Sequence, residues 1–198
     1  MQEADPDVAL MLAFQAGDDS AFDGLYHRWA GPLLRYLERM VGDTATAEEL
    51  LQDAFLRVHR ARARYEPRAR FSTFLYRIAT NLALNELKRP RRRHRHAEEQ
   101  DQVIPDPRPH AEEQLDIGLR RERVEQWLDQ LPERQRVALW LSAAEGCSYA
   151  EVAKVLETTE KSVKALVHRG RSALVSKMNE AAAARLDGPA LALASESV

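Results

Sequence analysis

The feature that most constrains the fold is a spacing of three and four residues between apolar side chains. It is clearest in residues 22–40, and it returns in residues 47–58 and 71–82. A helix of about 3.6 residues per turn places such positions on one face, whereas a half-buried strand would alternate them. The composition agrees, because 30 Ala and 25 Leu accompany only three Ile. We therefore predict an all-α fold.

Local signals mark the ends of several helices. Asp5 is a good N-cap and Gly17 a good terminator, which together predict a helix over residues 6–16. For the helix with the apolar spacing at residues 47–58, Thr44 or Thr46 is the expected N-cap.

Charge is strongly segregated along the chain. Residues 57–95 hold 13 Lys and Arg and only two acidic residues, net +11, after a net charge of −8 over residues 1–56. Two interpretations stay open: a solvated basic face that pairs with the acidic first part, or a surface for a polyanion. Aromatic residues inside the block favour single-stranded nucleic acid, because bases stack on rings while phosphates pair with cations. These aromatic residues are Tyr65, Phe71, Phe74 and Tyr76, of which Phe74 is expected to be a core residue.

Residues 96–116 separate two helical units. They lose the apolar periodicity, carry a net charge of −6 and contain three prolines, which predicts a poorly structured linker. The predicted organisation is a first domain at 6–95, a linker at 96–118, a second domain at 119–180 and an Ala-rich tail at 181–198.

A short helix and a longer one, joined by a short turn in the second domain, fit a helix-turn-helix. Ser148 and Glu151 form a capping box, and Thr159 is the expected cap of a second helix that runs to about Lys177. An ordinary helical hairpin with a charged outer face is the alternative, but basic residues gather on the second helix. The candidates for contacts with base edges or phosphates are Thr159, Glu160, Lys161, Ser162, Lys164, His168, Arg169 and Arg171.

Four stretches together resemble a known family. Residues 47–58 (AEELLQDAFLRV) resemble region 2.2 of bacterial sigma factors, and residues 71–83 (FSTFLYRIATNLA) resemble regions 2.3 and 2.4. Residues 131–136 (LPERQR) and 162–171 (SVKALVHRGR) resemble region 4 and its recognition helix. Two such domains with a short linker, over roughly residues 8–180, resemble the extracytoplasmic-function (ECF) group of the sigma-70 family.

The resemblance implies an alternative sigma factor that binds core RNA polymerase and directs it to promoter DNA. Region 2.2 of the family docks on the clamp of the largest polymerase subunit. Leu51 and Phe55 have a second interpretation as core residues, which we favour for Phe55. The docking candidates are Glu49, Leu51, Gln52, Asp53, Phe55 and Arg57.

The resemblance also implies that the basic block opens the minus-10 element and holds one unstacked base of the non-template strand. Asn81 is the sharpest candidate, because its amide both donates and accepts hydrogen bonds. The basic run at 91–95 is expected to contact phosphates without reading sequence. The minus-10 candidates are Arg64, Tyr65, Arg70, Phe71, Arg77, Asn81, Lys88 and Arg89.

Regulation and location follow from the same resemblance. Members of the family are commonly held by an anti-sigma factor, which is the further partner expected here. The acidic linker is either a mimic of RNA charge or a plain tether. An acidic N-terminus without an apolar segment, and the absence of a run of roughly 18 apolar residues, predict a cytoplasmic protein with no membrane span.

Several positions depart from the family pattern, three of them in the second domain. Glu157 stands where Gly is common in the turn, and Leu166 stands where Arg is common in the recognition helix. Both are expected to weaken minus-35 recognition. Gly170 replaces a usual Ala and should weaken its helix by about 1 kcal/mol.

No constellation of residues predicts catalysis, a metal or a cofactor. A helical nucleic-acid enzyme would need Glu49 and Asp53 to bind a cation, but they lack a companion nucleophile. His94, His96, Glu98 and Glu99 share no predicted ordered geometry. A lowered pKa is conceivable for Cys147, the single cysteine, because it precedes a helix. We predict a non-enzymatic protein, with a helix-turn-helix regulator that acts without polymerase as the alternative.

Overall fold

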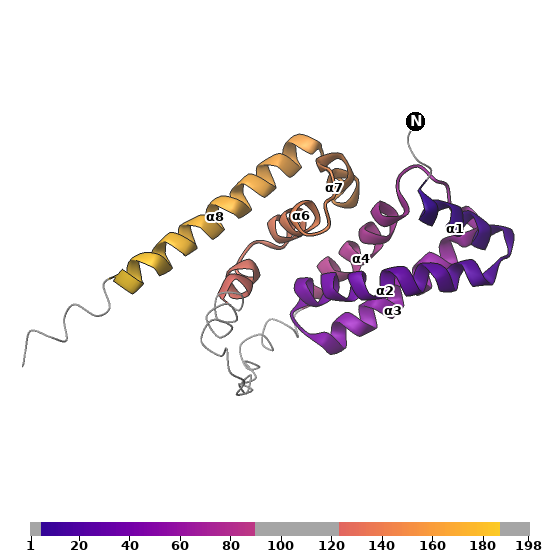
Figure 1. The fold of residues 1–198 in the computed structure, drawn as a ribbon, viewed down its shortest axis with the longest axis horizontal. Helices are drawn as coiled ribbons and strands as arrows, with labels where there is room; N and C mark the ends of the chain where they lie inside the picture. Colours follow the sequence, from indigo (N-terminus) through magenta and orange to yellow (C-terminus); the bar gives the residue numbers. More distant parts are fainter. Residues whose placement is uncertain (1–4, 90–122, 187–198) are drawn as a thin grey trace, which may run out of the picture.

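The computed structural model describes residues 5–89 and 123–186, and within these ranges every regular element is a helix (Figure 1). An N-terminal bundle contains α1 (Pro6–Ala16), α2 (Asp19–Val41), α3 (Thr44–Ala61), the 3₁₀ helix η1 (Arg62–Arg64) and α4 (Phe71–Leu87). A C-terminal unit contains a helical segment at 123–129, α6 (Glu133–Ala143), α7 (Tyr149–Val155) and α8 (Glu160–Leu186). The all-α prediction is confirmed. None of the described helices is both long enough and apolar enough to cross a bilayer.

The N-terminal bundle is built around large side chains from all four of its α-helices. Phe14 of α1, Tyr36 of α2, Phe55 of α3 and both Phe71 and Tyr76 of α4 are almost completely buried. The rings of Tyr36 and Tyr76 meet edge to face at 5.2 Å, and the Tyr36 hydroxyl lies 2.6 Å from the hydroxyl of Thr80. Aromatic pairs in this geometry add to the stability gained by burial alone. The apolar face of α4 is therefore committed to packing.

Asp5 fixes where α1 and α4 begin. One carboxylate oxygen accepts from the backbone N–H of Asp7 at 3.0 Å and caps α1 as predicted. The other oxygen accepts from the backbone N–H of Phe71 at 3.0 Å. Gln15 on α1 also donates to the carbonyls of Arg62 and Tyr65, at 3.0 and 3.1 Å. The segment that leads into α4 is thus held against α1.

The expected cap of α3 was wrong by a few residues. Asp43 is the N-cap, and its carboxylate accepts hydrogen bonds from the backbone N–H and the hydroxyl of Thr46. Thr44 is already the first residue of α3. An ionised carboxylate is a stronger acceptor for the free N–H groups at a helix start than a hydroxyl.

The C-terminal unit confirms the predicted helix-turn-helix geometry. Ser148 and Glu151 form the capping box at the start of α7, and Thr159 accepts from the backbone N–H of Ser162 at 3.2 Å. Ala153 on α7 and Val163 on α8 are buried where the two helices meet. The prediction that the second helix ends near Lys177 was wrong, since α8 continues to Leu186.

The bundle and the C-terminal unit are in contact. Helix α7 and the turn before it lie against α4, and the segment at 123–129 lies near α2 (Figure 1). Helix α8 packs on α6 and α7, and its C-terminal half extends away from the bundle (Figure 1).

Candidate nucleic-acid interface

A polar stripe runs along the exposed side of α4. Arg77 and Asn81 on α4 are exposed, as is Lys88, the C-cap residue directly after it; Asn85 lies between Asn81 and Lys88 and is exposed as well. Steps of four, four and three residues keep these side chains on one side of the helix, over about 16 Å of its length. We call these four residues the α4 stripe. Asn85 was not among the predicted site residues, although its spacing of four from Asn81 was a signal that could have found it.

Two cations flank the start of α4. Arg64 is exposed in η1, and Arg70 is exposed directly before the helix. The Arg70 guanidinium lies 3.5 Å from the carboxylate of Glu151 on α7. At the other end of α4, Arg89 is exposed and pairs with Glu86 at 2.7 Å.

The predicted aromatic stacking surface was wrong for Tyr65, Phe71 and Tyr76, whereas Phe74 packs against the core as expected. Tyr65 is 6% exposed, Phe71 0% and Tyr76 1%, and Phe74 is half-buried. Phe74 contacts both Tyr65, at a ring distance of 5.3 Å, and Phe71, at 6.2 Å. These rings are needed to pack α4 on the bundle, because each buries a large apolar area. Tyr65 and Phe71 therefore support the site from beneath in this structure and do not line its surface.

The Tyr65 hydroxyl is buried without a hydrogen-bond partner. Burial, together with the nearby carboxylate of Asp5, raises the pKa of Tyr65 to about 12. The hydroxyl consequently stays neutral near pH 7.

The predicted residues of the recognition helix point outward. All eight lie on or directly before α8; Ser162 is half-buried and the other seven are exposed. Lys164, His168 and Arg171 line a shallow groove that also contacts Tyr149, the first residue of α7. Basic side chains of α8 line this groove, and the first residue of α7 borders it. Such a groove is suited to a phosphate backbone. Leu166 is half-buried and packs against the core, so it contributes to the fold.

The turn before α8 carries a strained residue. Glu157 has a φ of 49°, which makes it the single non-glycine residue with positive φ in the part of the chain that the structure describes. This left-handed conformation favours glycine, the residue that is common there in the family that the sequence resembles.

The predicted docking set divides into two groups on α3. Glu49, Gln52, Asp53 and Arg57 are exposed, whereas Leu51 is 7% and Phe55 4% exposed. The interpretation of Phe55 as a core residue is confirmed, and Leu51 belongs to the core with it. Leu56 was missed by the sequence analysis: it is 51% exposed and is the one large apolar side chain that described α3 presents to solvent.

The Cys147 prediction was also wrong. Burial raises the pKa of the Cys147 thiol to about 11, and the carboxylates of Glu151 and Glu145 add to the effect. The described residues hold no group of three or more His, Cys, Asp or Glu that could bind a metal ion. His94, His96, Glu98 and Glu99, the basic run at 91–95 and the acidic linker lie outside the described residues.

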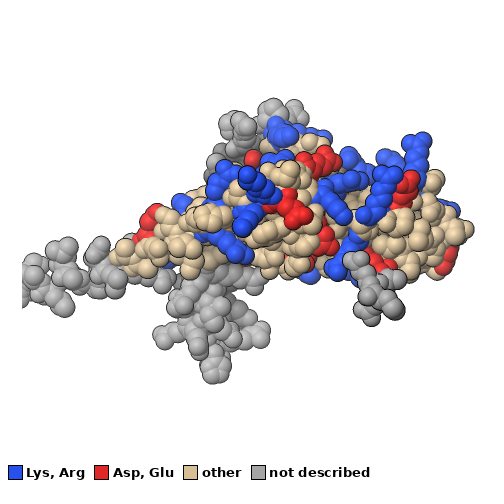
Figure 2. All heavy atoms as spheres, turned by 90° about the horizontal axis from the view of Figure 1, so that it is seen from above, with Lys and Arg blue, Asp and Glu red and all other residues tan. Residues whose placement is uncertain are grey.

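Basic side chains are more prominent than acidic ones on one face of the molecule (Figure 2). Figure 2 shows Lys and Arg spread over this face of both the bundle and the C-terminal unit, with acidic side chains between them. A surface of this kind attracts a polyanion to both parts of the chain.

Comparisons with known proteins decide the family. The model described as Sigma-70 region 2 matches residues 25–93, and the model described as Sigma-70, region 4 matches residues 121–174. RNA polymerase sigma factor CarQ of Myxococcus xanthus is 35% identical across 86% of this chain and 96% of its own length. ECF RNA polymerase sigma factor SigM of Mycobacterium tuberculosis is 34% identical across 85% of this chain and 82% of its own length. The chain belongs to the ECF group of the sigma-70 family.

Two solved structures share the fold of this sigma factor. CnrH, in complex with the cytosolic domain of CnrY, superposes with a TM-score of 0.66 at 23% identity and covers 88% of this chain and 97% of that chain. RpoE from Bartonella quintana, in complex with the anti-sigma factor NepR, gives a TM-score of 0.60 at 21% identity, with coverage of 80% and 96%.

The family also separates the rival functions. Region 2 matches from within α2 to beyond α4, and region 4 matches α6, α7 and the first half of α8. The sigma factor is a transcription initiation factor and not an enzyme, which removes the nuclease alternative.

Proposed function

We propose that this ECF sigma factor binds core RNA polymerase through α3, opens the minus-10 element with α4 and reads the minus-35 element with α8. The observation that carries the proposal is the α4 stripe, which presents two amides and two cations on one exposed face inside region 2. The proposed domains are residues 6–95 and 119–180, joined by the acidic linker at 96–118. The tail at 181–198 begins inside α8.

The α4 stripe has the chemistry for a single strand. Asn81 and Asn85 each offer an amide that donates and accepts, while Arg77 and Lys88 offer charge to phosphates. Removal of a base from the stack costs a few kcal/mol, which contacts to the exposed base must offset. Arg64 and Arg70 extend the positive surface to the loop before α4. Tyr65 and Phe71 act in this proposal by holding that loop in place.

Helix α8 has the chemistry for a duplex. Its first turn, at Thr159 to Ser162, offers hydroxyls and charged groups that reach base edges when the helix enters the major groove. Lys164, His168 and Arg171 then meet phosphates along the groove that they line.

The polymerase contact rests on an exposed patch of α3. Glu49, Gln52, Asp53 and Arg57 are polar, and Leu56 gives the patch an apolar centre. A ring of polar groups around one apolar anchor is typical of protein interfaces. The partner expected from the family is the clamp of the largest polymerase subunit.

An anti-sigma factor is the second proposed protein partner. CnrH and RpoE, the fold neighbours, were each solved with another protein, and NepR is described as an anti-sigma factor. Because its proposed partners are RNA polymerase and promoter DNA, this sigma factor is proposed to act in the cytoplasm. Co-purification of a partner from unstressed cells would support this part, and isolation of the chain alone would count against it.

Run-off transcription tests the main proposal. The sigma factor is mixed with core polymerase on a library of promoter fragments, and new start sites are mapped. Core polymerase alone is the control, because it starts without selecting a promoter. We expect a set of start sites that requires the sigma factor and shares two sequence elements. No added start sites would refute the proposal.

A further inference from the structure

The segment between η1 and α4 has few hydrogen bonds of its own. Residues 65–70 belong to no helix or strand, and the one backbone hydrogen bond within them joins the N–H of Arg68 to the carbonyl of Glu66 at 2.8 Å. Each residue of such a segment loses conformational freedom when it is fixed in one arrangement. Contacts with other parts of the bundle must therefore set the shape of this segment.

Gln15, in the last turn of α1, supplies two of these contacts. Its side-chain nitrogen donates to the carbonyl of Arg62 at 3.0 Å and to the carbonyl of Tyr65 at 3.1 Å. An amide nitrogen carries two N–H bonds, so both donors of Gln15 are used, one for each carbonyl. Gln15 is half-buried, and hydrogen bonds that are shielded from water are stronger than exposed ones. One side chain of α1 therefore holds both ends of the turn at residues 62–65.

Other residues near α1 fix the remaining parts of the segment. The Arg62 guanidinium lies over the Phe14 ring at 4.7 Å and pairs with Asp19 at 3.0 Å. At the far end of the segment, Asp5 accepts from the backbone N–H of Phe71. The segment is thus anchored at both ends by α1 and the residues that flank it.

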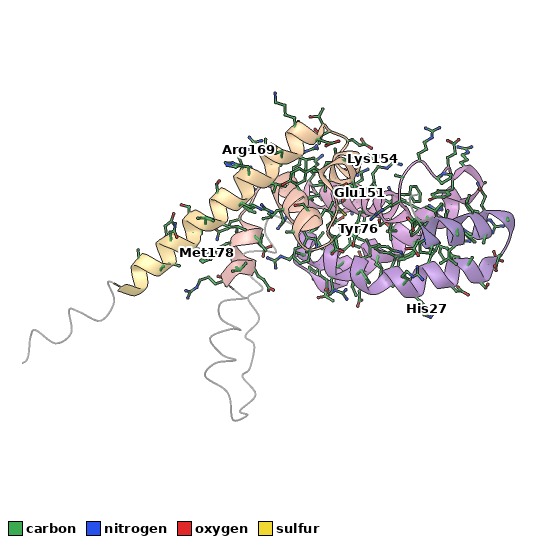
Figure 3. All side chains as sticks on the ribbon, turned by 45° about the horizontal axis from the view of Figure 1, so that its top comes forward. His27, Tyr76, Glu151, Lys154, Arg169 and Met178 are labelled. Atoms are coloured by element: carbon green, nitrogen blue, oxygen red, sulfur yellow. The ribbon has the colours of Figure 1, made fainter. Side chains whose placement is uncertain are left out.

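The anchored segment carries a group of cations. Arg64, Arg68 and Arg70 are all exposed, and Arg64 and Arg70 are minus-10 candidates. Helix α4 begins directly after Arg70 and runs past Tyr76, which is labelled in Figure 3. The conformation of the segment therefore decides where these cations lie relative to the α4 stripe.

We propose that Gln15 is a positioning residue for the minus-10 surface, which fixes the segment so that Arg64 and Arg70 are already in place when a strand leaves the duplex. The inference rests on the proposed function, since it adds a residue of α1 to the proposed opening step. Gln15 lies before residue 25, where the match to Sigma-70 region 2 begins. A surface that is ordered in advance binds more tightly, because less conformational freedom is lost on binding.

Two substitutions of similar size test the proposal in the full chain. Gln15→Glu replaces the donating nitrogen with a second oxygen, which repels both carbonyls. Gln15→Met removes the two hydrogen bonds without adding a charge. Circular dichroism checks that both variants stay folded, which we expect because Gln15 is only half-buried.

Limited trypsin digestion measures how firmly the segment is held. Trypsin cleaves after arginine where the backbone can open locally, and mass spectrometry quantifies the peptides that end at Arg64 and Arg68. Cleavage of this kind follows the population of the open form. We expect cleavage at both sites to rise about tenfold in both variants, the effect of losing two modest hydrogen bonds.

Permanganate reactivity of unpaired thymines measures promoter opening by the sigma factor bound to core polymerase. We expect both variants to lower the equilibrium constant for opening about tenfold, because the segment must then be ordered during binding. Their affinity for core polymerase should match that of the natural chain. A merely structural role of Gln15 would weaken polymerase binding together with opening, because both need the folded bundle.

Two control variants match the chemistry of these substitutions. Gln126→Glu makes the same exchange at an exposed position of the C-terminal unit. His27→Ala removes a side chain whose Nδ1 lies 2.8 Å from the carbonyl of Asp23 on α2, and Figure 3 shows His27 pointing away from the bundle. Both controls should match the natural chain in trypsin cleavage and in opening.

The outcomes separate this inference from the proposed function. Unchanged cleavage at Arg64 and Arg68, unchanged opening, or a loss of polymerase binding as large as the loss of opening would each overturn the role of Gln15. In these cases, opening by the natural chain leaves the proposed function intact. If the natural chain with core polymerase opens no promoter, the proposed function and the inference that rests on it are both overturned.

Discussion

The two candidate DNA surfaces differ in how much of each helix is free. Helix α4 buries its aromatic face in the bundle and keeps a narrow polar stripe, whereas α8 exposes seven of the eight predicted contact residues. A helix at the centre of a bundle has one exposed side, while a recognition helix that packs on two neighbours leaves most of its circumference in solvent. The difference teaches that the minus-10 surface and the core are formed by the same helix, so that changes in α4 affect both.

The largest expected effect distinguishes residues at the start of α4 that stabilise the bundle from residues there that contact DNA. Phe71→Ala should lower the free energy of unfolding of the bundle by about 3–5 kcal/mol, because it removes a fully buried ring. Urea denaturation followed by circular dichroism measures the change. Arg70→Ala, at the exposed neighbour, should leave stability nearly unchanged. A stable Phe71→Ala variant that fails to bind a strand would reverse our placement of this residue.

The next effect tests the α4 stripe directly. Asn81→Ala should weaken promoter opening by about 1–3 kcal/mol, the range for an amide that contacts a base edge. Permanganate reactivity of unpaired thymines in the polymerase complex measures opening. Asn179→Ala, which removes an exposed amide near the end of α8, is the matched control. Equal opening in both variants would remove Asn81 from the site.

The turn before α8 offers the third test. Glu157→Gly should stabilise the C-terminal unit by about 1–2 kcal/mol, because a residue with a φ of 49° no longer carries a side chain. Thermal unfolding measures the gain. Glu157→Ala separates backbone from charge, since it removes the carboxylate but keeps the strained conformation. A gain of the same size in Glu157→Ala would show that charge is the cause.

A smaller effect concerns phosphate contacts on α8. Lys164→Ala should lower the slope of log affinity against log salt by about one, which corresponds to roughly threefold between 50 and 200 mM salt. Anisotropy with a duplex that carries a mapped minus-35 element measures the slope. Arg35→Ala, an exposed cation on α2, should leave the slope unchanged.

The smallest effect concerns packing inside α8. A Cβ at Gly170 would meet its nearest neighbours, in α6 and at Leu131, at an ordinary 3.7 Å. Gly170→Ala should therefore stabilise the C-terminal unit by about 0.5–1 kcal/mol, through lower backbone entropy in the unfolded chain. Gly17→Ala should destabilise the bundle, because Gly17 has a φ of 111°. Thermal unfolding distinguishes the two, and a loss of stability in Gly170→Ala would mean that α6 cannot accept the methyl group.

Features set by neighbours in the sequence were predictable. The capping box at Ser148 and Glu151 and the end of α1 at Gly17 follow from local chemistry, and each appears where expected. The end of α8 was predicted wrongly at about Lys177, although Ala181 to Ala184 are strong helix formers and no stop signal occurs before Gly188.

Features set by distant partners were not predictable. The sequence placed Tyr65 and Phe71 among cations, but only the packing of α4 and of the segment before it on the rest of the bundle decides that both rings point inward. The Tyr76–Glu145 hydrogen bond joins residues 69 positions apart, and no local pattern announces it. Prediction of the exposed docking patch on α3 also required knowledge of the tertiary packing, because spacing alone did not separate buried Phe55 from exposed Leu56.

Asp5 has a practical consequence for work with this protein. Its carboxylate accepts a hydrogen bond from the first backbone N–H of α4. Residues at the N-terminus therefore help to position the helix that is proposed to contact the melted strand. Trimming the N-terminus past this aspartate, as is often done to obtain crystals, would loosen a distant surface while leaving every DNA-facing side chain in place. Such a shortened protein would keep every residue proposed to contact DNA and would still bind DNA more weakly.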